Sequence, residues 1–190
     1  MKLEDQYYID KVLAGQTASY SYLIERYKTM VFTIAMKIVR NREDAEEVAQ
    51  DCFLKAYQKL ESYKGESKFS TWLYTIVYRT AISKIRKKQI EVSDLNDNMN
   101  KIREESGFTD PLELMKYEEQ KEFVAKAINL LPETEAVLIT LYYLNDSSVE
   151  EIEQITGLGN SNVKTKLFRA RKKMYDTLHV LLNEEMKSIV

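Results

Sequence analysis

Residues 148–174 have the sequence SVEEIEQITGLGNSNVKTKLFRARKKM, and this stretch decides the fold of the C-terminal half of the chain. Ser148 is placed to cap a short helix, and Glu151 three positions later completes a capping box. Gly157 and Gly159 then permit a sharp turn, because glycine adopts backbone conformations that strain other residues. A second helix follows the turn. The stretch therefore predicts a helix-turn-helix.

The second helix of this motif separates an apolar face from a cationic face. Its apolar positions recur at helical spacing and are predicted to face the core: Val163, Leu167, Ala170 and Met174. From Ser161 to Tyr175 there are six Lys or Arg residues and no acid, in a chain whose net charge is −2. The opposite face carries Lys164, Thr165, Lys166, Phe168, Arg169, Lys172 and Lys173. This face is typical of a helix that enters a DNA major groove, and the alternative is a helical hairpin with a solvated basic face.

The composition indicates a helical protein with no catalytic or metal centre. Only five Gly and two Pro occur among 190 residues, which favours helices, and 44% hydrophobic residues suffice for packed cores. Cys52 and His179 are each the single residue of their type, which excludes a disulfide framework and a Cys- or His-rich metal site. We expect no cofactor and no enzymatic activity. No signal-peptide pattern or membrane span is apparent, so the expected location is the cytoplasm.

The N-terminal half begins with amphipathic helices over residues 1–40, followed by a helix over residues 43–60 that Asn41 can cap. The apolar positions of the helix over residues 43–60 form one stripe. A second stripe at helical spacing, on another side, is Glu47, Gln50, Asp51 and Leu54. An acidic and amide surface with a leucine in its middle suits docking to a partner with a basic helix. A plain solvated acidic face is an equally good interpretation of the spacing.

Aromatic and cationic residues are interleaved in the next segment, a polar loop over residues 61–68 and a helix over residues 70–88. The residues concerned include Lys64, Lys68, Phe69, Trp72, Tyr74, Tyr78 and Arg79. Single-stranded DNA binding requires this combination, because cations contact phosphates and rings stack on unpaired bases. The alternative is that these aromatic side chains belong to the core.

A weakly periodic segment separates this half from the helix-turn-helix half. Residues 89–116 are predicted to be a flexible linker, with seven acids and two cations between Glu91 and Glu113. Further helices are expected over residues 117–129 and 133–144, before the helix-turn-helix. The fold class is therefore all-α, with two small helical domains, residues 1–88 and 117–190, of which the second is a four-helix domain.

Three stretches in this order resemble the extracytoplasmic-function (group IV) sigma factors of bacterial RNA polymerase, in the sigma-70 family. They are EDAEEVAQDCFLKAY (residues 43–57), KFSTWLYTIVYRTAISKIRKK (residues 68–88) and LPETEAVLITLYYLNDSSVEEIEQITGLGNSNVKTKLFRARKKM (residues 131–174). The resemblance covers nearly the whole chain. It implies a region 2-like first domain, a region 4-like second domain, and a non-enzymatic role in transcription initiation.

The resemblance also implies roles for individual residues. The stripe Glu47, Gln50, Asp51 and Leu54 matches the helix that docks on the clamp helices of the largest polymerase subunit. The −10 element would be captured and held single-stranded, with one base flipped out, by Lys64, Ser67, Lys68, Phe69, Trp72, Tyr74, Tyr78 and Arg79. The −35 element would be contacted by Lys164, Thr165, Phe168 and Arg169, with Ser161, Lys166 and Arg171 on phosphates or sugars. Two residues depart from the pattern: Arg79 replaces an Asn that is common in the family, and Glu153 replaces a small residue.

The linker length bears on how both promoter elements could be bound. Elements about two DNA turns apart lie on the order of 70 Å from each other. A linker of 28 residues could stretch to about 95 Å but as a free coil would span only about 30 Å. The resemblance suggests that the polymerase surface holds the domains apart and that the acidic linker occupies a nucleic-acid channel. We expect the isolated protein to bind promoter duplex weakly.

The expected partners are core RNA polymerase, through its clamp helices and flap region, promoter DNA, and an anti-sigma factor, with no insertion into a membrane. The competing interpretation is a stand-alone helix-turn-helix regulator, which would need a dimer interface or a ligand domain to pair its half-sites. The acidic stripe and the aromatic-cationic segment would then have no purpose. A helical adaptor without a DNA role is contradicted by the segregated cations of the last helix.

Overall fold

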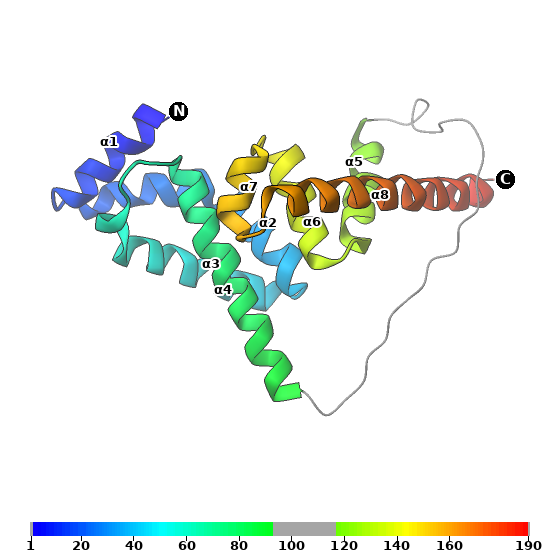
Figure 1. Cartoon of the computed structure of the whole chain (residues 1–190), viewed down its shortest axis with the longest axis horizontal. Coiled ribbons are helices and arrows are strands. Elements are labelled where there is room, and N and C mark those ends of the chain that lie inside the picture. Colours follow the sequence, from blue (N-terminus) through cyan, green and yellow to red (C-terminus); the bar gives the residue numbers. More distant parts are fainter. Residues whose placement is uncertain (1, 93–116, 190) are drawn as a thin grey trace.

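The computed structural model describes residues 2–92 and 117–189, and within these residues every regular element is a helix, as the sequence predicts. The first unit contains α1 (Lys2–Leu13), η1 (Thr17–Ser19), α2 (Tyr20–Val39), α3 (Arg42–Gln58), η2 (Leu60–Ser62) and α4 (Phe69–Val92). The second contains α5 (Tyr117–Leu130), α6 (Glu133–Ile139), the π-helical turn η4 (Thr140–Leu144), α7 (Val149–Thr156) and α8 (Asn160–Ile189). The all-α prediction is confirmed (Figure 1).

Helices α2, α3 and α4 pack against one another and form the core of the first unit. Each contributes an apolar stripe at helical spacing, as Leu73, Val77 and Ala81 do on α4, and these side chains are fully buried. Cys52 of α3 is also buried, and burial raises the pKa of its thiol to about 12. A thiol with that pKa is not a reactive nucleophile at neutral pH, so Cys52 acts as a small core residue.

Two helix boundaries in the first unit follow from local chemistry. The Asn41 side chain accepts a hydrogen bond of 2.9 Å from the backbone N–H of Asp44, which caps α3 at its N-terminus. At the other end of the unit, α4 continues to Val92, so residues 89–92 of the predicted linker are helical. The remainder of that prediction, residues 93–116, lies outside the described residues.

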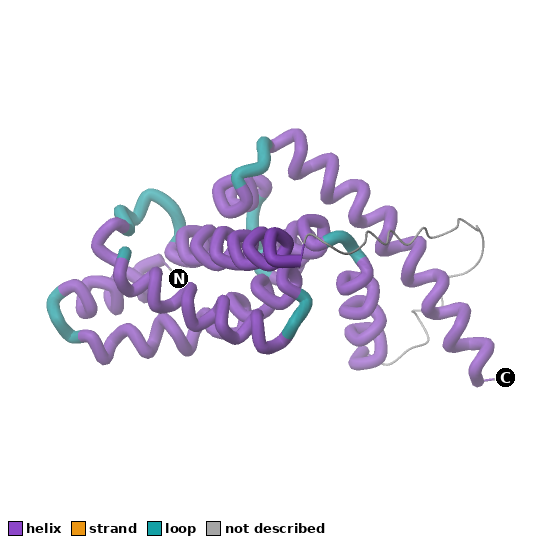
Figure 2. Tube along the Cα trace, turned by 90° about the horizontal axis from the view of Figure 1, so that it is seen from below, coloured by secondary structure: helices purple, strands orange, loops and turns teal. Residues whose placement is uncertain are grey.

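The second unit contains the predicted helix-turn-helix in α7 and α8. Ser148 Oγ accepts from Glu151 N at 3.2 Å, and Glu151 Oε2 accepts from Ser148 N at 2.9 Å, so the capping box is confirmed. Helix α8 packs on α5, α6 and α7, and its C-terminal half projects beyond them (Figures 1 and 2). None of the helices in the described part of the chain is long and apolar enough to span a membrane.

The two units are packed against each other. Helix α4 contacts α7, and α2 contacts α6. The buried apolar side chains of both units form one continuous cluster, which includes Leu73 of α4 and Ile152 of α7. This arrangement brings the helix-turn-helix of the second unit against the aromatic-cationic helix of the first.

The two glycines of the α7–α8 turn have different roles. Gly157 is the C-cap of α7 and has a φ of +74°, the left-handed region in which a side chain is strained. Gly159 is outside that region, and a Cβ added there would meet nothing within 4 Å. Only Gly157 is therefore required by the backbone of the turn.

Replacing Gly157 by Ala is expected to lower the free energy of unfolding by about 1 kcal/mol, because Ala is strained in the left-handed region. The matched control is Gly159→Ala. That change should leave stability unchanged or raise it by up to about 1 kcal/mol, since it restricts the unfolded chain without straining the folded one. Urea unfolding followed by circular dichroism measures both variants. Equal destabilisation by the two substitutions would contradict this assignment.

Candidate nucleic-acid and partner interfaces

The acidic stripe of α3 (Glu47, Gln50, Asp51 and Leu54) lies on the surface of the first unit. Leu54 is 57% exposed and lies among polar side chains. Glu47 forms an ion pair of 2.6 Å with Lys84, and Asp51 one of 3.6 Å with Lys55. The stripe therefore combines an exposed apolar side chain with carboxylates whose intramolecular ion pairs a partner's cations would have to replace.

Lys84 and Lys88 connect the end of α4 to α3. Lys84 Nζ lies 3.1 Å from Asp44 Oδ1, and Lys88 Nζ lies 3.0 Å from Asp44 Oδ2. Hydrogen bonds from Lys88 and Lys84 lower the pKa of the Asp44 carboxyl, and the bond to Glu47 raises the pKa of Lys84. These two lysines interact with the carboxylates of α3, so they contribute less to any phosphate contact than the sequence pattern suggests.

The aromatic residues of the −10 prediction do not all lie on the surface. Phe69 and Tyr74 are each only 2% exposed, and their rings pack against Tyr27 at centroid distances of 5.6 and 6.2 Å. Neither ring is accessible to a base in this structure, because α4 turns both toward α2. Phe69 and Tyr74 are core residues in this structure, which corrects the expectation that they contact DNA. Trp72 and Tyr78 are half-buried.

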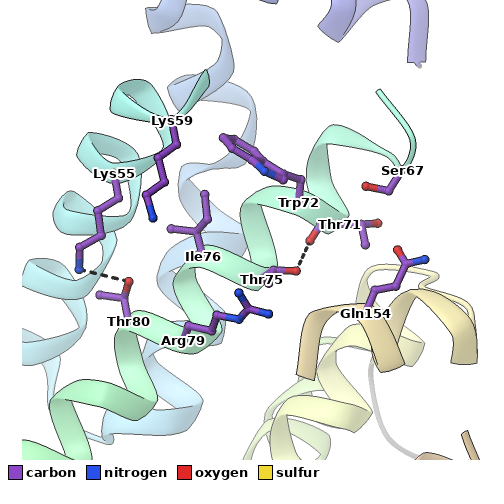
Figure 3. A pocket seen from close by; sticks show the side chains of 10 residues that line it. All are labelled: Lys55, Lys59, Ser67, Thr71, Trp72, Thr75, Ile76, Arg79, Thr80 and Gln154. Atoms are coloured by element: carbon purple, nitrogen blue, oxygen red, sulfur yellow. Dashed lines mark hydrogen bonds between the residues drawn. The ribbon is translucent and has the colours of Figure 1, made fainter. Parts of the chain in front are cut away.

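A pocket of about 370 Å³ lies between α3, α4 and α7, and it brings together three of the predicted −10 residues (Figure 3). These are Ser67, Trp72 and Arg79. The remaining lining residues are Lys55, Lys59, Thr71, Thr75, Ile76, Thr80 and Gln154. Three cations, four hydroxyl groups and an indole ring line this pocket, a combination that suits a nucleic-acid strand, with phosphates on the cations and a base beside the ring.

The sequence prediction missed the contribution of α3 to this pocket. Lys55 and Lys59 are one helical turn apart, and so are Thr71 and Thr75 on α4, so each pair lies on one face of its helix. This spacing was visible in the sequence. What was not visible is that the two faces meet, because that depends on how α3 and α4 are rotated against each other.

The loop between η2 and α4 is closed by a side-chain hydrogen bond. Tyr63 OH donates to the backbone oxygen of Ser67 at 2.8 Å. The Tyr63 ring also packs against Phe69 and Trp72, each at a centroid distance of 5.5 Å. Lys64 is exposed at the tip of the loop. Tyr63 was not among the predicted site residues, yet it fixes the shape of the loop that carries several of them.

The recognition face of α8 is exposed as predicted. Its apolar positions Val163, Leu167 and Ala170 are buried. Phe168 is 67% exposed, and the exposed polar positions are Ser161, Lys164, Thr165, Arg169 and Arg171. Lys166 is half-buried, and Arg171 Nη1 donates to Tyr143 OH at 3.4 Å. A large apolar ring among cations on one helix face suits contact with base edges and phosphates in a major groove.

Glu153, the departure from the family pattern in α7, is half-buried. Helices α7 and α8 nevertheless pack together, and Ile152 and Ile155 of α7 and Val163 of α8 are fully buried. The larger side chain at position 153 therefore does not prevent the helix-turn-helix from forming.

Comparisons with known proteins cover both units. Residues 23–90 match Sigma-70 region 2, and residues 124–174 match Sigma-70, region 4. The ECF RNA polymerase sigma-E factor of Escherichia coli (strain K12) is 32% identical over 188 residues, 95% of this chain and 97% of that protein. The RNA polymerase sigma-H factor of Pseudomonas aeruginosa is 28% identical over 187 residues, with the same coverage of 95% and 97%.

Two solved structures are similar in fold. The sigma factor RpoE in complex with the anti-sigma factor NepR from Bartonella quintana matches with a TM-score of 0.65 at 23% identity, covering 85% of this chain and 97% of that chain. CnrH in complex with the cytosolic domain of CnrY matches with a TM-score of 0.64 at 20% identity, covering 93% and 97%.

Replacing Tyr63 by Phe removes the hydroxyl that closes the loop and keeps the ring. The lost hydrogen bond should contribute about 1 kcal/mol, so backbone amides of residues 64–68 should exchange with solvent about fivefold faster. Hydrogen exchange measured by mass spectrometry tests this. The matched control is Tyr57→Phe, because the Tyr57 hydroxyl makes no hydrogen bond within the described residues. Unchanged exchange in the Tyr63 variant would show that the ring alone holds the loop.

Proposed function

The chain belongs to the extracytoplasmic-function RNA polymerase sigma factors, and on that premise we propose that it binds core RNA polymerase and directs promoter-specific initiation of transcription. The first unit docks on the polymerase and captures the −10 element, and the second unit binds the −35 element. The polymerase supplies the chemistry. The chain contributes recognition and strand capture and is not itself an enzyme.

The pocket between α3, α4 and α7 is the observation that carries this proposal. It gathers the cations Lys55, Lys59 and Arg79 around the half-buried ring of Trp72. Duplex DNA offers no unpaired base to such a pocket, whereas a melted non-template strand offers both phosphates and bases. A base flipped out of the stack costs a few kcal/mol, which contacts in the pocket can offset. Arg79, where relatives often carry Asn, supplies a cation instead of an amide at this position.

A stand-alone helix-turn-helix regulator would account for the recognition face of α8 alone. It would leave the acidic stripe and the pocket of the first unit without a role. The acidic stripe lies on α3, and α3 and α4 line most of the pocket. A sigma factor would use these two helices both to dock on the polymerase and to capture the melted strand. The sigma-factor proposal therefore explains more of the molecule.

We also propose that an anti-sigma factor controls the chain. One similar structure contains a sigma factor bound to an anti-sigma factor, and another contains CnrH bound to the cytosolic domain of CnrY. The acidic stripe with its exposed Leu54 is a surface that such a partner could mask in competition with the polymerase.

The decisive experiment asks whether the purified chain lets core bacterial RNA polymerase open a promoter duplex, with permanganate footprinting of unpaired thymines as the readout. We expect opening with core and none without it. The double variant Glu47→Lys, Asp51→Lys should bind core about tenfold more weakly or worse, because reversed charges repel the partner's cations. The matched control is Glu25→Lys, an exposed acid on α2 outside the stripe. That change should leave core binding intact.

Two outcomes would count against the proposal. Footprinting of duplex DNA by the chain alone, without association with core, would establish the stand-alone regulator. Loss of core binding in the Glu25 control in proportion to its charge change, +2 against +4 in the stripe variant, would show that total charge, rather than the stripe, governs docking.

The recognition face can be tested by selecting −35 sequences from a randomised library with the assembled holoenzyme. Arg169→Ala should relax the selected sequence at one position, with a cost of about 1–3 kcal/mol for the preferred base. Lys166→Ala should weaken binding of all sequences alike and lower the salt dependence by about one phosphate contact. If both variants select the same −35 sequence as the wild type and keep its salt dependence, these assignments are wrong.

A further inference from the structure

None of the proposed polymerase or DNA contacts lies on α1, which also precedes residues 23–90, the part of the chain that matches Sigma-70 region 2. The helix nevertheless packs against α2, η1 and η2 (Figure 1). Its Gln6 side chain lies beside the loop that follows η2, since a Cβ built on Gly65 would be 3.9 Å from Gln6 Oε1. Helix α1 is therefore a neighbour of the loop that carries several of the −10 residues.

Helix α1 buries a carboxylate against α2. Asp5 is only 6% exposed, and Tyr27 OH of α2 donates to Asp5 Oδ2 at 2.7 Å. Arg26 Nη1 lies 3.3 Å from Asp5 Oδ1, which accepts no hydrogen bond within the described residues. Removing one partner of a buried carboxylate leaves the other without its hydrogen bond. The bond from Tyr27 to Asp5 therefore holds α1 on α2 in one orientation.

The ring of Tyr27 continues this contact as far as the strand pocket. Its centroid lies 5.6 Å from that of Phe69. Phe69 lies 5.5 Å from both Tyr63 and Trp72, and the rings of Tyr63 and Trp72 are also 5.5 Å apart. Aromatic pairs at these separations stabilise one another beyond the area that they bury. A continuous row of rings thus joins Asp5 to Trp72, which lines the pocket.

The charge of Asp5 acts on three tyrosines of this row and its surroundings. Burial and, after it, the Asp5 charge raise the pKa of Tyr63 and that of Tyr74. Burial and the hydrogen bond to Asp5 raise the pKa of Tyr27. All three phenols are therefore protonated at neutral pH, and Tyr27 remains a donor to Asp5.

We propose that α1 is a supporting helix for strand capture and that Asp5 is a positioning residue, which acts through Tyr27 and Phe69 to hold the ring of Trp72 and the loop before α4. This inference rests on the proposed function. Asp5 is buried, so it contacts neither DNA nor polymerase itself. A ring that is already held in its bound orientation favours binding, because the strand does not have to order it.

Trp72 is the single tryptophan of the chain, so its fluorescence reports directly on this support. Asp5→Ala removes the acceptor of the Tyr27 hydroxyl, and Tyr27→Phe removes the hydroxyl while keeping the ring. Each change should raise the acrylamide quenching constant of Trp72 about twofold, because a less restrained ring meets the quencher more often. Asp5→Asn keeps an acceptor oxygen and should restore most of the wild-type value. Circular dichroism checks that each variant is folded.

The same variants should separate promoter opening from polymerase binding. With saturating core polymerase, Asp5→Ala and Tyr27→Phe should each open a promoter about fivefold less, the change expected for loss of one hydrogen bond. Affinity for core should stay near the wild-type value, since the acidic stripe pairs with Lys84 and Lys55 rather than with these rings. The double variant should be no worse than either single variant, because both changes break the same bond. Permanganate footprinting measures opening, and a titration measures core binding.

The matched control is Asp10→Ala, which removes an exposed acid from the same helix. The Asp10 side chain accepts from Gln6 Nε2 at 2.8 Å and is not part of the contact between Asp5 and Tyr27. This change should leave both the quenching of Trp72 and promoter opening at their wild-type values.

Four outcomes would overturn the proposal. They are unchanged quenching in the folded Asp5→Ala and Tyr27→Phe variants, equal effects in the Asp10 control, higher quenching with normal promoter opening, and a parallel loss of core binding and opening. The last of these indicates general destabilisation of the first unit. Failure of the wild-type chain to open a promoter would instead contradict the proposed function. Quenching is measured without DNA or polymerase, so it tests the support of Trp72 separately.

Discussion

Burial of Leu73, Val77 and Ala81 against α2 and α3 fixes the rotation of α4, and the functional surfaces of the first unit depend on that rotation. A helix has 3.6 residues per turn, so fixing one stripe fixes every other position. With this stripe buried, Trp72 and Arg79 line the pocket and Lys84 reaches the carboxylates of α3. The same rotation places Lys68 and Tyr74 against the second unit. One packing constraint therefore positions the pocket, the contacts of Lys84 with α3 and the contact between the units.

The cations of the chain divide according to what they face. Lys84 and Lys88 pair with carboxylates of α3, and Lys68 pairs with Glu151 of α7. Lys59 and Arg79 line the pocket and form no ion pair within the described residues. The paired lysines connect neighbouring helices, whereas Lys59 and Arg79 remain available to the phosphates of a DNA strand. In a chain with a net charge of −2, local placement of cations rather than overall charge must determine where DNA binds.

The sequence predicted what is local and missed what depends on tertiary packing. The Asn41 cap, the Ser148 capping box and the buried face of α8 follow from spacing within one helix, and all are found. The sequence predicts DNA contacts for Phe69 and Tyr74 because they lie among cations. Aromatic residues in that pattern can equally well belong to the core. Periodicity could not separate these roles, because the core-facing side of α4 is set by α2. The pocket residues of α3 and the packing of α7 on α4 join segments far apart in the chain, which no local pattern encodes.

The contact between the two units combines partly exposed ion pairs with buried apolar side chains. Partly exposed ion pairs such as Arg40–Glu133 typically contribute less than about 1 kcal/mol each. Leu73 of α4 and Ile152 of α7 are fully buried in one continuous cluster, and full burial of a side chain of this size contributes about 1.5–3 kcal/mol. Apolar burial therefore contributes more to the contact than its ion pairs do. A partner separates the units only by as much as its affinity for the separated chain exceeds its affinity for the packed one.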